Sequence, residues 1–183
     1  MNKLITILSF SSRNSGNCFA IGRYVSKYYK NHAVHSVVID RNTVPACGKC
    51  DYECLKPGSL CPQRSTEYDQ IMDAICRSDL VYFIVPNFCG YPCSNYFAFN
   101  ERSVGYFGMD RDKMDRYMNV PKRFIIVSNT EGFEDAMRQQ TNEPPEILYL
   151  KSHAYGKSSI AGDILESDAA KADLDAFLSL RDL

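Results

Sequence analysis

Residues 3–18 read KLITILSFSSRNSGNC, and this stretch decides how the whole chain is interpreted. Its first part, residues 3–9, is a short apolar run rich in β-branched side chains, which predicts a buried β-strand. Its second part is a polar loop with hydroxyl groups, an arginine and a glycine, and it ends the strand. A helical pattern begins at residue 17. This order of strand, loop and helix is typical of an α/β domain.

The same alternation continues to the end of the chain. Further apolar runs predict strands, and amphipathic segments between them predict helices. Because the strands read as continuous apolar runs, we expect a parallel sheet covered by helices on both faces. The sequence thus predicts an α/β fold, a single domain over residues 1–183 with a five-stranded, doubly wound sheet. The predicted strands cover residues 3–9, 34–39, 80–85, 123–127 and 147–150, and the predicted helices cover residues 17–29, 65–75, 133–140 and 167–180.

The composition excludes several classes of function. The 183 residues include 45% hydrophobic and 23% charged side chains, as in ordinary soluble globular proteins. A formal net charge of −1 gives no electrostatic support to a nucleic-acid partner. No apolar run approaches the length of a membrane span, and residues 4–8 are too short for the core of a signal peptide. We therefore expect a cytoplasmic protein with neither a nucleic acid nor a membrane as its partner.

The loop after the first strand is a candidate phosphate site. In an open parallel sheet, ligands bind beyond the carboxyl ends of the strands, where the strand order reverses. Hydroxyl groups and an arginine precede a helix N-terminus here, where free N–H groups and the helix dipole favour an anion. A polar loop that only caps the helix would have the same composition. Competing motifs are missing: the chain has no G-x-G-x-x-G, and Gly156-Lys157-Ser158 lacks the upstream glycine of a P-loop.

Two loops resemble those of the NAD(P)H-dependent FMN reductase and iron–sulfur flavoprotein group of flavodoxin-like proteins. The group's first loop typically reads G-S-P-R-x-x-G-N-[ST]. Residues 10–18 match it at Ser11, Arg13, Gly16 and Asn17, and they depart from it at Phe10, Ser12 and Cys18. The departure at Cys18 replaces a hydroxyl that the group usually offers to the phosphate.

The second matching loop follows the third predicted strand. In the group it reads P-x-[YF]-x-G-x-P, followed by F-x-[DE]-R. Every defined position is present here, as Pro86, Phe88, Gly90, Pro92, Phe99, Glu101 and Arg102. A lysine that is common two residues before the phenylalanine is replaced by Phe97. The two loops and the rhythm of five strands match in order, so the resemblance covers nearly the whole chain.

The resemblance implies a flavodoxin-like three-layer sandwich that binds FMN. It implies that the first loop holds the phosphate, that the loop after the third strand lines the isoalloxazine, and that the loop after the fourth strand touches its other side. It implies no catalytic acid or base, because the protein's task is to position the flavin. The implied cofactor-binding residues are Ser11, Arg13, Ser15, Gly16, Asn17 and Cys18 in the first loop, Pro86, Asn87, Phe88, Cys89 and Gly90 in the second, and Asn129, Thr130, Glu131 and Gly132 in the third.

The activity that the resemblance implies is an oxidoreductase. NAD(P)H would reduce FMN, and the electrons would pass to a quinone, a free flavin, a small oxidant or a protein. Proteins of this group are commonly oligomers, so a homodimer or homotetramer is expected. Two alternatives stay open: a non-enzymatic electron carrier of the flavodoxin type, and a metal or thiol sensor on a flavin-free scaffold. The substitutions at Phe10, Cys18 and Phe97 favour the sensor.

Four of the eight cysteines lie in the predicted long loop over residues 41–65, spaced as Cys47-x2-Cys50-x3-Cys54-x6-Cys61. Four thiolates from one loop can ligate a [4Fe–4S] cluster, and they can also form a tetrahedral zinc site. A loop packed by small residues without a metal is the third interpretation. The iron–sulfur flavoproteins carry a compact four-cysteine motif after the second strand, with two residues rather than three between its second and third cysteines.

Two further cysteines, Cys89 and Cys93, lie in the loop that the resemblance places beside the flavin ring. A redox role would require exposed and stabilised thiolates. Simple packing is the alternative interpretation.

Overall fold

The computed structural model of the chain describes residues 2–11, 13, 15–40, 42–48 and 50–180. A parallel sheet with the strand order β2-β1-β3-β5-β6 lies at its centre, and the short strand β4 pairs antiparallel with the end of β3. The strands are β1 (Leu4–Phe10), β2 (Ala33–Ile39), β3 (Leu80–Phe88), β4 (Tyr91–Pro92), β5 (Lys122–Val127) and β6 (Glu146–Leu150). The parallel sheet predicted from the apolar runs is confirmed.

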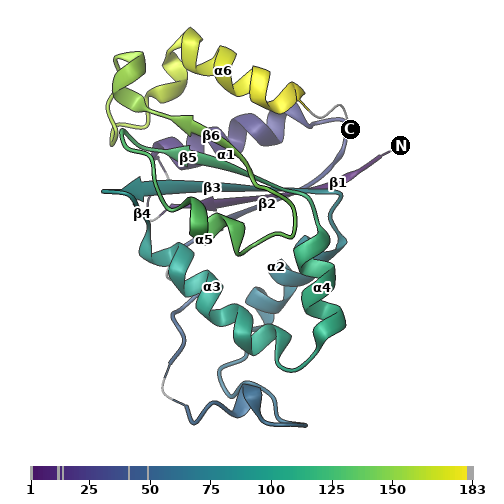
Figure 1. The fold of residues 1–183 in the computed structure, drawn as a ribbon. Coiled ribbons are helices and arrows are strands. Elements are labelled where there is room, and N and C mark those ends of the chain that lie inside the picture. Colours follow the sequence, from purple (N-terminus) through teal and green to yellow (C-terminus); the bar gives the residue numbers. More distant parts are fainter. Residues whose placement is uncertain (1, 12, 14, 41, 49, 181–183) are drawn as a thin grey trace.

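Helices cover both faces of the sheet, as Figure 1 shows. Helices α1 and α6 lie on one face, and α2, α3 and α4 lie on the other, where α5 packs beside β6. The helices are α1 (Asn17–Tyr28), α2 (Thr66–Arg77), α3 (Ser94–Phe107), α4 (Arg111–Asn119), α5 (Glu134–Arg138) and α6 (Asp168–Ser179), with 3-10 turns η1 (Glu53–Leu55), η2 (Ser152–Tyr155) and η3 (Ile164–Glu166). The three-layer flavodoxin-like sandwich is confirmed.

Burial explains why the strands read as continuous apolar runs. Residues 80–85 of β3 are buried on both faces, and so is all of β5, because each lies between two other strands. Strands β2 and β6 are at the edges of the sheet and are only partly buried. Two hydrophobic cores result, one under α2, α3 and α4 and one under α1 and α6. Burial of the apolar side chains in these two cores is the main favourable term in the free energy of folding.

The order of the strands predicts a crevice at the carboxyl ends of the strands. From β1 the chain passes to its neighbour β2 and then crosses to β3 on the other side of β1. Helix α1 therefore covers one face and α2 covers the other. A ligand site is expected at this switch point, beyond the carboxyl ends of the strands.

Helices α3 and α4 were not predicted from the sequence. The buried face of α3 includes the polar residues Asn95 and Arg102 beside its aromatic rings. Exposed Phe97 and Val104 lie on its outer surface. This mixture hides the 3.6-residue period on which a helix prediction depends. The predicted loop over residues 41–65 does lack regular structure apart from η1, in the part that the structure describes.

None of the described helices is both long and apolar enough to span a lipid bilayer.

Candidate functional site

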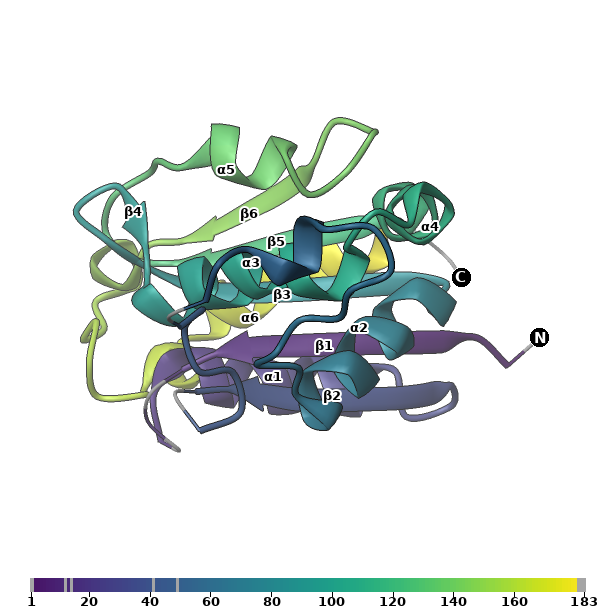
Figure 2. The ribbon, with the colours of Figure 1, turned by 90° about the horizontal axis from the view of Figure 1, so that it is seen from below.

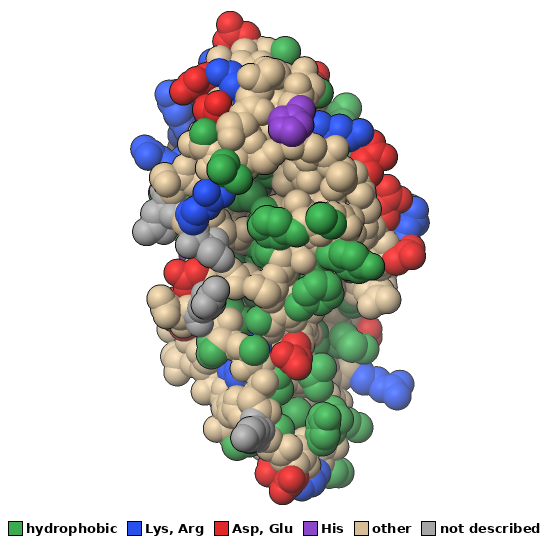
Figure 3. Space-filling model, turned by 90° about the vertical axis from the view of Figure 1, so that its left-hand side faces the viewer, with side chains coloured by type: hydrophobic (Ala, Val, Ile, Leu, Met, Phe, Trp, Pro, Cys, Tyr) green, Lys and Arg blue, Asp and Glu red, His purple; other side chains and the backbone are tan. Residues whose placement is uncertain are grey.

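A cavity of about 380 Å³ opens at the carboxyl ends of β1, β3 and β5, at the switch point of the sheet. We call it the carboxyl-edge pocket, and its volume falls within the usual range for small-ligand sites. Figure 3 shows this face of the molecule, where hydrophobic side chains gather across the middle and lower part. Its lining residues are Phe10, Ser11, Arg13, Gly16, Asn17, Cys18, Pro86, Asn87, Phe88, Cys89, Cys93, Val127, Ser128, Asn129, Thr130, Ser159 and Ile160.

A wider depression of about 630 Å³ lies at the opposite end of the sheet, before β3 and β5. Charged and polar groups, including Asp79, Asp112, Asp115 and Arg116, form much of its lining. Because it faces the amino ends of the strands, it lies away from the switch point and does not meet the rule for ligand sites in such sheets.

The polar end of the carboxyl-edge pocket is the N-terminus of α1. Helices α2, α4 and α6 begin with a Ser or Asp side chain that accepts a hydrogen bond from a backbone N–H of the first turn. Helix α1 begins at Gly16, which supplies no such cap, and its first turn carries no acidic residue. Its first N–H groups thus keep the capacity to bind an anion.

Arg13 supplies positive charge to the same end of the pocket. Its guanidinium lies near Gly16, since a Cβ placed on that glycine would be 3.8 Å from Nε and Nη2 of Arg13. Ser11 holds the backbone of Arg13: its Oγ donates to the carbonyl of Arg13 at 2.7 Å and accepts from the N–H of Arg13 at 3.2 Å. Ser15 is exposed and does not line the pocket.

Asn17 lines the pocket, but its side chain is occupied by backbone groups of a distant segment. Its Nδ2 donates to the carbonyls of Ser158 and Ser159 at 3.1 and 3.4 Å. Its Oδ1 accepts from the N–H of Ile164 at 3.1 Å. Asn17 is 4% exposed, so these bonds lie in a largely dry environment. The side chain of Asn17 is therefore bonded to backbone groups of residues 158–164, and the phosphate contact that the resemblance implies for Asn17 stays a prediction.

Apolar side chains form the other end of the pocket. Phe10, at the end of β1, is fully buried and packs edge-on against Tyr96 and Phe99 of α3. Phe88 and Ile160 are instead 63% and 68% exposed at the pocket's rim. A planar aromatic ligand could bury these two exposed side chains.

The loop after β3 is a tight hairpin. Cys89 and Gly90, between the paired residues Phe88 and Tyr91, have φ of +54° and +88°. Two central residues with positive φ are typical of a type I′ turn, which favours Asn and Gly rather than Cys. Cys89 therefore holds a conformation that costs about 1 kcal/mol for an ordinary residue. Backbone strain of this kind often occurs at ligand sites.

The side chain of Asn87 and a close approach of two glycines join this hairpin to the loop after β5. Asn87 accepts from the N–H of Gly90 through Oδ1 and donates to the carbonyl of Thr130 through Nδ2, both at 2.8 Å. Gly132, at a φ of +144°, lies so close to Gly90 that a Cβ on it would be 2.7 Å from the Gly90 carbonyl oxygen. Gly90 and Gly132 thus shape the pocket from behind rather than line it.

The loop after β5 contributes unequally to the pocket. Asn129 and Thr130 line it. Glu131 does not, because its carboxylate points to solvent and pairs with Lys151 at 2.5 Å. Asn129 also holds the segment that follows β6, because its Oδ1 accepts a hydrogen bond from the N–H of His153 at 2.8 Å.

Two buried thiols lie on the pocket wall. Cys18 is 5% exposed at the start of α1, and Cys93 is 8% exposed at the N-terminus of α3. Burial raises the pKa of both thiols above the ordinary value. Since the thiolate is the nucleophile, both groups are weak nucleophiles at neutral pH.

Most of the residues implied by the two-loop resemblance line the carboxyl-edge pocket. The exceptions are Ser15, Gly90, Glu131 and Gly132. Sequence reasoning placed Cys93 in the loop beside the flavin ring without naming it as a cofactor-binding residue, and it missed Phe10, Val127, Ser128, Ser159 and Ile160. Cys93, Val127 and Ser128 adjoin residues already singled out, so the ends of the predicted strands and helices could have indicated them. Ser159 and Ile160 gave no such signal, because only the fold brings them to the first loop.

The residues present fit FMN. An uncapped helix N-terminus with a nearby arginine suits the phosphate. An apolar wall with the exposed aromatic side chain of Phe88 suits the isoalloxazine. Backbone groups of the Cys89-Gly90 turn lie beside that wall.

A second cavity, of about 210 Å³, lies in the cysteine-rich loop. We call it the cysteine cavity. Cys47, Cys50, Cys54 and Cys61 all line it, together with Gly48, Tyr52, Glu101, Arg102, Val104 and Gly105. Within the described part of the chain, however, no three His, Cys, Asp or Glu side chains converge closely enough to hold a metal ion. The donor set as it stands does not fit a metal, and the site stays a prediction from the spacing.

Helix α3 holds the cysteine-rich loop at both ends. The Cys47 N–H donates to Glu101 Oε2 at 3.1 Å. Arg102, 5% exposed, donates to the carbonyl of Gln63. Burial and the carboxylate of Glu101 raise the pKa of the Cys47 thiol. Glu101 and Arg102, the last residues of the second matching motif, thus fasten the loop to the fold.

The sequence matches no protein-family model and no curated protein. The structure is similar to solved structures across nearly the whole chain. It resembles the Trp repressor binding protein from Bacillus subtilis (TM-score 0.62, 13% identity, 98% of this chain and 100% of that chain). It also resembles an NAD(P)H:quinone oxidoreductase from Methanothermobacter marburgensis (0.61, 14%, 99% and 100%) and a flavoenzyme NAD(P)H:(acceptor) oxidoreductase from Paracoccus denitrificans (0.55, 11%, 97% and 96%).

At these identities the similarities establish the fold. The second and third of these structures are NAD(P)H-dependent oxidoreductases, and the third is a flavoenzyme. The resemblance predicted from the loops is therefore confirmed at the level of the fold.

Proposed function

We propose that this protein is an oxidoreductase that binds FMN in the carboxyl-edge pocket and transfers electrons from NAD(P)H to an acceptor. The observation that carries the proposal is the pocket itself, with an anion-binding end at the uncapped N-terminus of α1 and an aromatic rim at Phe88. The presence of a flavoenzyme and a quinone oxidoreductase among the similar structures supports it.

FMN, when bound, supplies the group that accepts hydride and releases electrons. The chain's own residues bind and orient it. Backbone N–H groups at the start of α1, together with Arg13, hold the dianionic phosphate, and each charge-assisted hydrogen bond is stronger than a neutral one. Ser11 keeps the first loop in the shape that directs these donors inward.

The apolar residues keep water from one side of the cofactor while leaving the other accessible. Phe10 and Val127 close the floor of the pocket, and both are buried. At the rim, Phe88 and Ile160 are 63% and 68% exposed. NAD(P)H and a small-molecule or protein acceptor are proposed to approach across this exposed apolar rim, one after the other.

The test is rapid mixing of the anaerobic, FMN-loaded protein with NADH and with NADPH. Rapid bleaching of the flavin bands by either nucleotide supports the oxidoreductase. A bound flavin that stays oxidised with both would contradict it and favour an electron carrier. Protein that binds no FMN would contradict both and favour the sensor on a flavin-free scaffold.

We propose no electron-transfer step through the cysteine cavity. The spacing supports a [4Fe–4S] cluster or zinc, whereas the described residues hold no converging set of three ligands. Iron, sulfide and zinc analysis of protein purified without oxygen decides between them. About four irons per chain would assign Cys47, Cys50, Cys54 and Cys61 as ligands of a cluster.

We also propose that the protein is a homo-oligomer, a dimer or tetramer. Large apolar side chains are exposed on α3 and on the cysteine-rich loop, among them Phe97, Val104 and Leu60. A contiguous apolar surface of this kind favours association. Light scattering coupled to size-exclusion chromatography tests this, and a monomeric mass at all concentrations would contradict it.

A further inference from the structure

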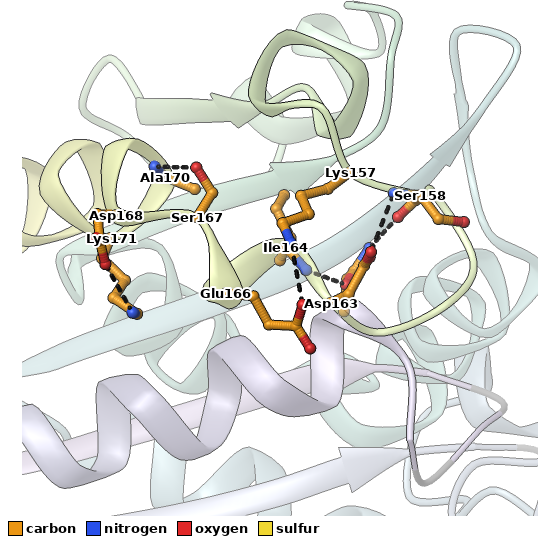
Figure 4. Close-up of polar contacts among 10 residues, drawn as sticks. Lys157, Ser158, Asp163, Ile164, Glu166, Ser167, Asp168, Ala170 and Lys171 are labelled. Carbon is orange, nitrogen blue, oxygen red and sulfur yellow. Dashed lines mark hydrogen bonds and ion pairs between the residues drawn. The ribbon is translucent and has the colours of Figure 1, made fainter.

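Residues 156–163 form a segment that we call the strap. It follows η2 and ends at η3, and Figure 4 shows it curving beside the N-terminal end of α1. Two of its residues, Ser159 and Ile160, line the carboxyl-edge pocket. The strap is far from the first loop in sequence and contains none of the residues implied to bind FMN, yet it forms one wall of the same pocket.

Asn17 is the main attachment point of the strap. Its amide donates to the carbonyls of Ser158 and Ser159 and accepts from the N–H of Ile164, so it binds backbone groups on both sides of the strap's turn. Breaking such bonds in a buried setting leaves polar groups without partners, which is costly. The Asn17 side chain is thus occupied within the protein and lacks a spare N–H for a phosphate.

Further contacts attach the strap to two of the cofactor loops. Arg13 Nη1 donates to the carbonyl of Ile160 at 3.1 Å. Asn129 Nδ2 donates to Ser159 Oγ at 2.5 Å. Gly162, at a φ of +81°, approaches the first loop so closely that a Cβ there would overlap the carbonyl oxygen of Ser15. The strap is therefore connected to the first loop and to the loop after β5.

The strap also has internal order. The N–H of Ile160 donates to Ser158 Oγ at 3.2 Å, and the N–H of Ser158 donates to Asp163 Oδ2 at 3.5 Å. Lys157 pairs with Glu166 at 3.0 Å, as Figure 4 shows. The first two bonds lie within the strap, and the Lys157–Glu166 pair attaches the strap to η3.

We propose that Asn17 is a positioning residue that fixes the strap as a wall of the pocket, so that opening of the strap sets the rate at which FMN dissociates. This inference rests on the proposed function. It assigns Asn17 a role different from direct phosphate binding, and it adds Ser159 and Ile160 to the cofactor-binding residues.

The first test uses flavin-free protein. The bond after Lys157 lies within the strap and is a trypsin site, so cleavage there reports strap opening. Asn17→Ala is compared with Asn142→Ala, which removes an exposed asparagine that bonds Asn119 away from the pocket. We expect cleavage after Lys157 to be about tenfold faster in Asn17→Ala than in the wild type. Cleavage after Arg77, at the end of α2, serves as the internal reference for global unfolding. If the ratio of the cleavage rate after Lys157 to that after Arg77 is the same in Asn17→Ala as in the wild type, the proposal is overturned.

The second test separates positioning from phosphate contact. Dissociation rates of FMN and of riboflavin, which lacks the phosphate, are measured for both variants. Loss of a pocket wall should accelerate both ligands in Asn17→Ala by a similar factor, about tenfold. Acceleration of FMN alone would overturn the proposal, because it would assign Asn17 to the phosphate. A wild-type protein that binds neither flavin would contradict the proposed function while leaving the proteolysis result interpretable.

A variant on the strap itself guards against a folding defect at Asn17. Gly162→Ala should loosen the strap from its own side, because the added methyl group clashes with the Ser15 carbonyl. We expect its cleavage after Lys157 to be faster as well. The double variant should be little faster than either single variant, since both release the same segment. If the increases in cleavage rate of the two single variants multiply in the double variant, the proposal is overturned.

Discussion

The carboxyl-edge pocket and the cysteine cavity lie along the same helix but are built differently. Helix α3 contributes Cys93, at its N-terminus, to the first and Glu101, Arg102 and Gly105 to the second. The pocket is enclosed by loops that leave the ends of three buried strands. The cysteine cavity is enclosed by a long irregular loop that a few side-chain bonds attach to α3.

This difference shows which of the two sites is preorganised. Strand ends cannot move without disturbing the sheet, so the pocket has its shape before a ligand arrives. The cysteine-rich loop can rearrange more easily, because irregular loops have lower local stability than the strands of a core. Its four thiols share a cavity without converging on one point, whereas the groups around the carboxyl-edge pocket are already positioned by hydrogen bonds.

The largest expected effect comes from Gly132→Ala. Its Cβ would lie 2.7 Å from the Gly90 carbonyl, and its φ of +144° disfavours any L side chain. We expect the free energy of unfolding to fall by about 3 kcal/mol and FMN affinity to fall at least about tenfold. Urea denaturation and a flavin titration measure these changes.

The matched control for that variant is Gly58→Ala. Gly58 also has a positive φ, +74°, but nothing lies within 4 Å of the added Cβ. Its cost should be about 1 kcal/mol of backbone strain. Equal losses in the two variants would contradict the role given to the contact between Gly90 and Gly132.

Arg102→Met should affect the other region. The substitution removes the bond to the Gln63 carbonyl and keeps much of the apolar side chain that packs near Tyr68. We expect a loss of about 2 kcal/mol in the free energy of unfolding and faster alkylation of Cys47. FMN affinity should change by less than about twofold. A large loss of FMN affinity would show that the two regions are coupled, contrary to the comparison above.

Cys89→Asn should have a smaller and opposite effect on stability. Asparagine adopts positive φ more readily than cysteine, so the type I′ turn loses its strain. We expect the free energy of unfolding to rise by about 1 kcal/mol, measured by urea denaturation of the flavin-free protein. A decrease would mean that the Cys89 side chain makes a stabilising contact which the turn geometry does not reveal.

The smallest effects concern thiol reactivity in the folded protein. Cys89 is exposed and should be alkylated first. Cys18 and Cys93 should react slowly at pH 7, because burial both shields them and raises the pKa of each thiol. Their rates should increase as the pH rises toward the raised pKa values, since the thiolate fraction grows. Mass spectrometry of timed alkylation checks the order, and early labelling of Cys18 would contradict it.

The sequence predicted the sheet because buried strands such as residues 80–85 leave an unmistakable apolar run. It indicated the first loop because Ser, Arg and Gly residues occur together there, and the loop after β3 because Pro86, Phe88, Gly90 and Pro92 match the motif of the group that the chain resembles. It could not predict the strap. Ser159 reaches the pocket by a tertiary contact with Asn17 and Ile160 by one with Arg13, and nothing near either end of these contacts indicates the other in the sequence.

Tertiary contacts also explain why the sequence did not reveal the arrangement of the four thiols or the partners of the Asn17 side chain. The spacing of the four cysteines could be read directly, but whether their sulfur atoms converge depends on how α3 holds the loop. Asn17 fits the motif of a phosphate loop by position, yet its side chain is satisfied by backbone groups from 158 to 164. Motifs locate a site, whereas the hydrogen-bond partners of a buried side chain come from the whole fold.

The central claim, that the carboxyl-edge pocket binds FMN through its phosphate, is tested most directly by titrating the flavin-free protein with FMN and with riboflavin. Flavin fluorescence follows binding in wild type and in Arg13→Gln. The account predicts one FMN per chain, riboflavin affinity lower by at least about tenfold, and a smaller difference between the two ligands in Arg13→Gln. Equal affinity for FMN and riboflavin in the wild type, or no binding of either, would contradict it.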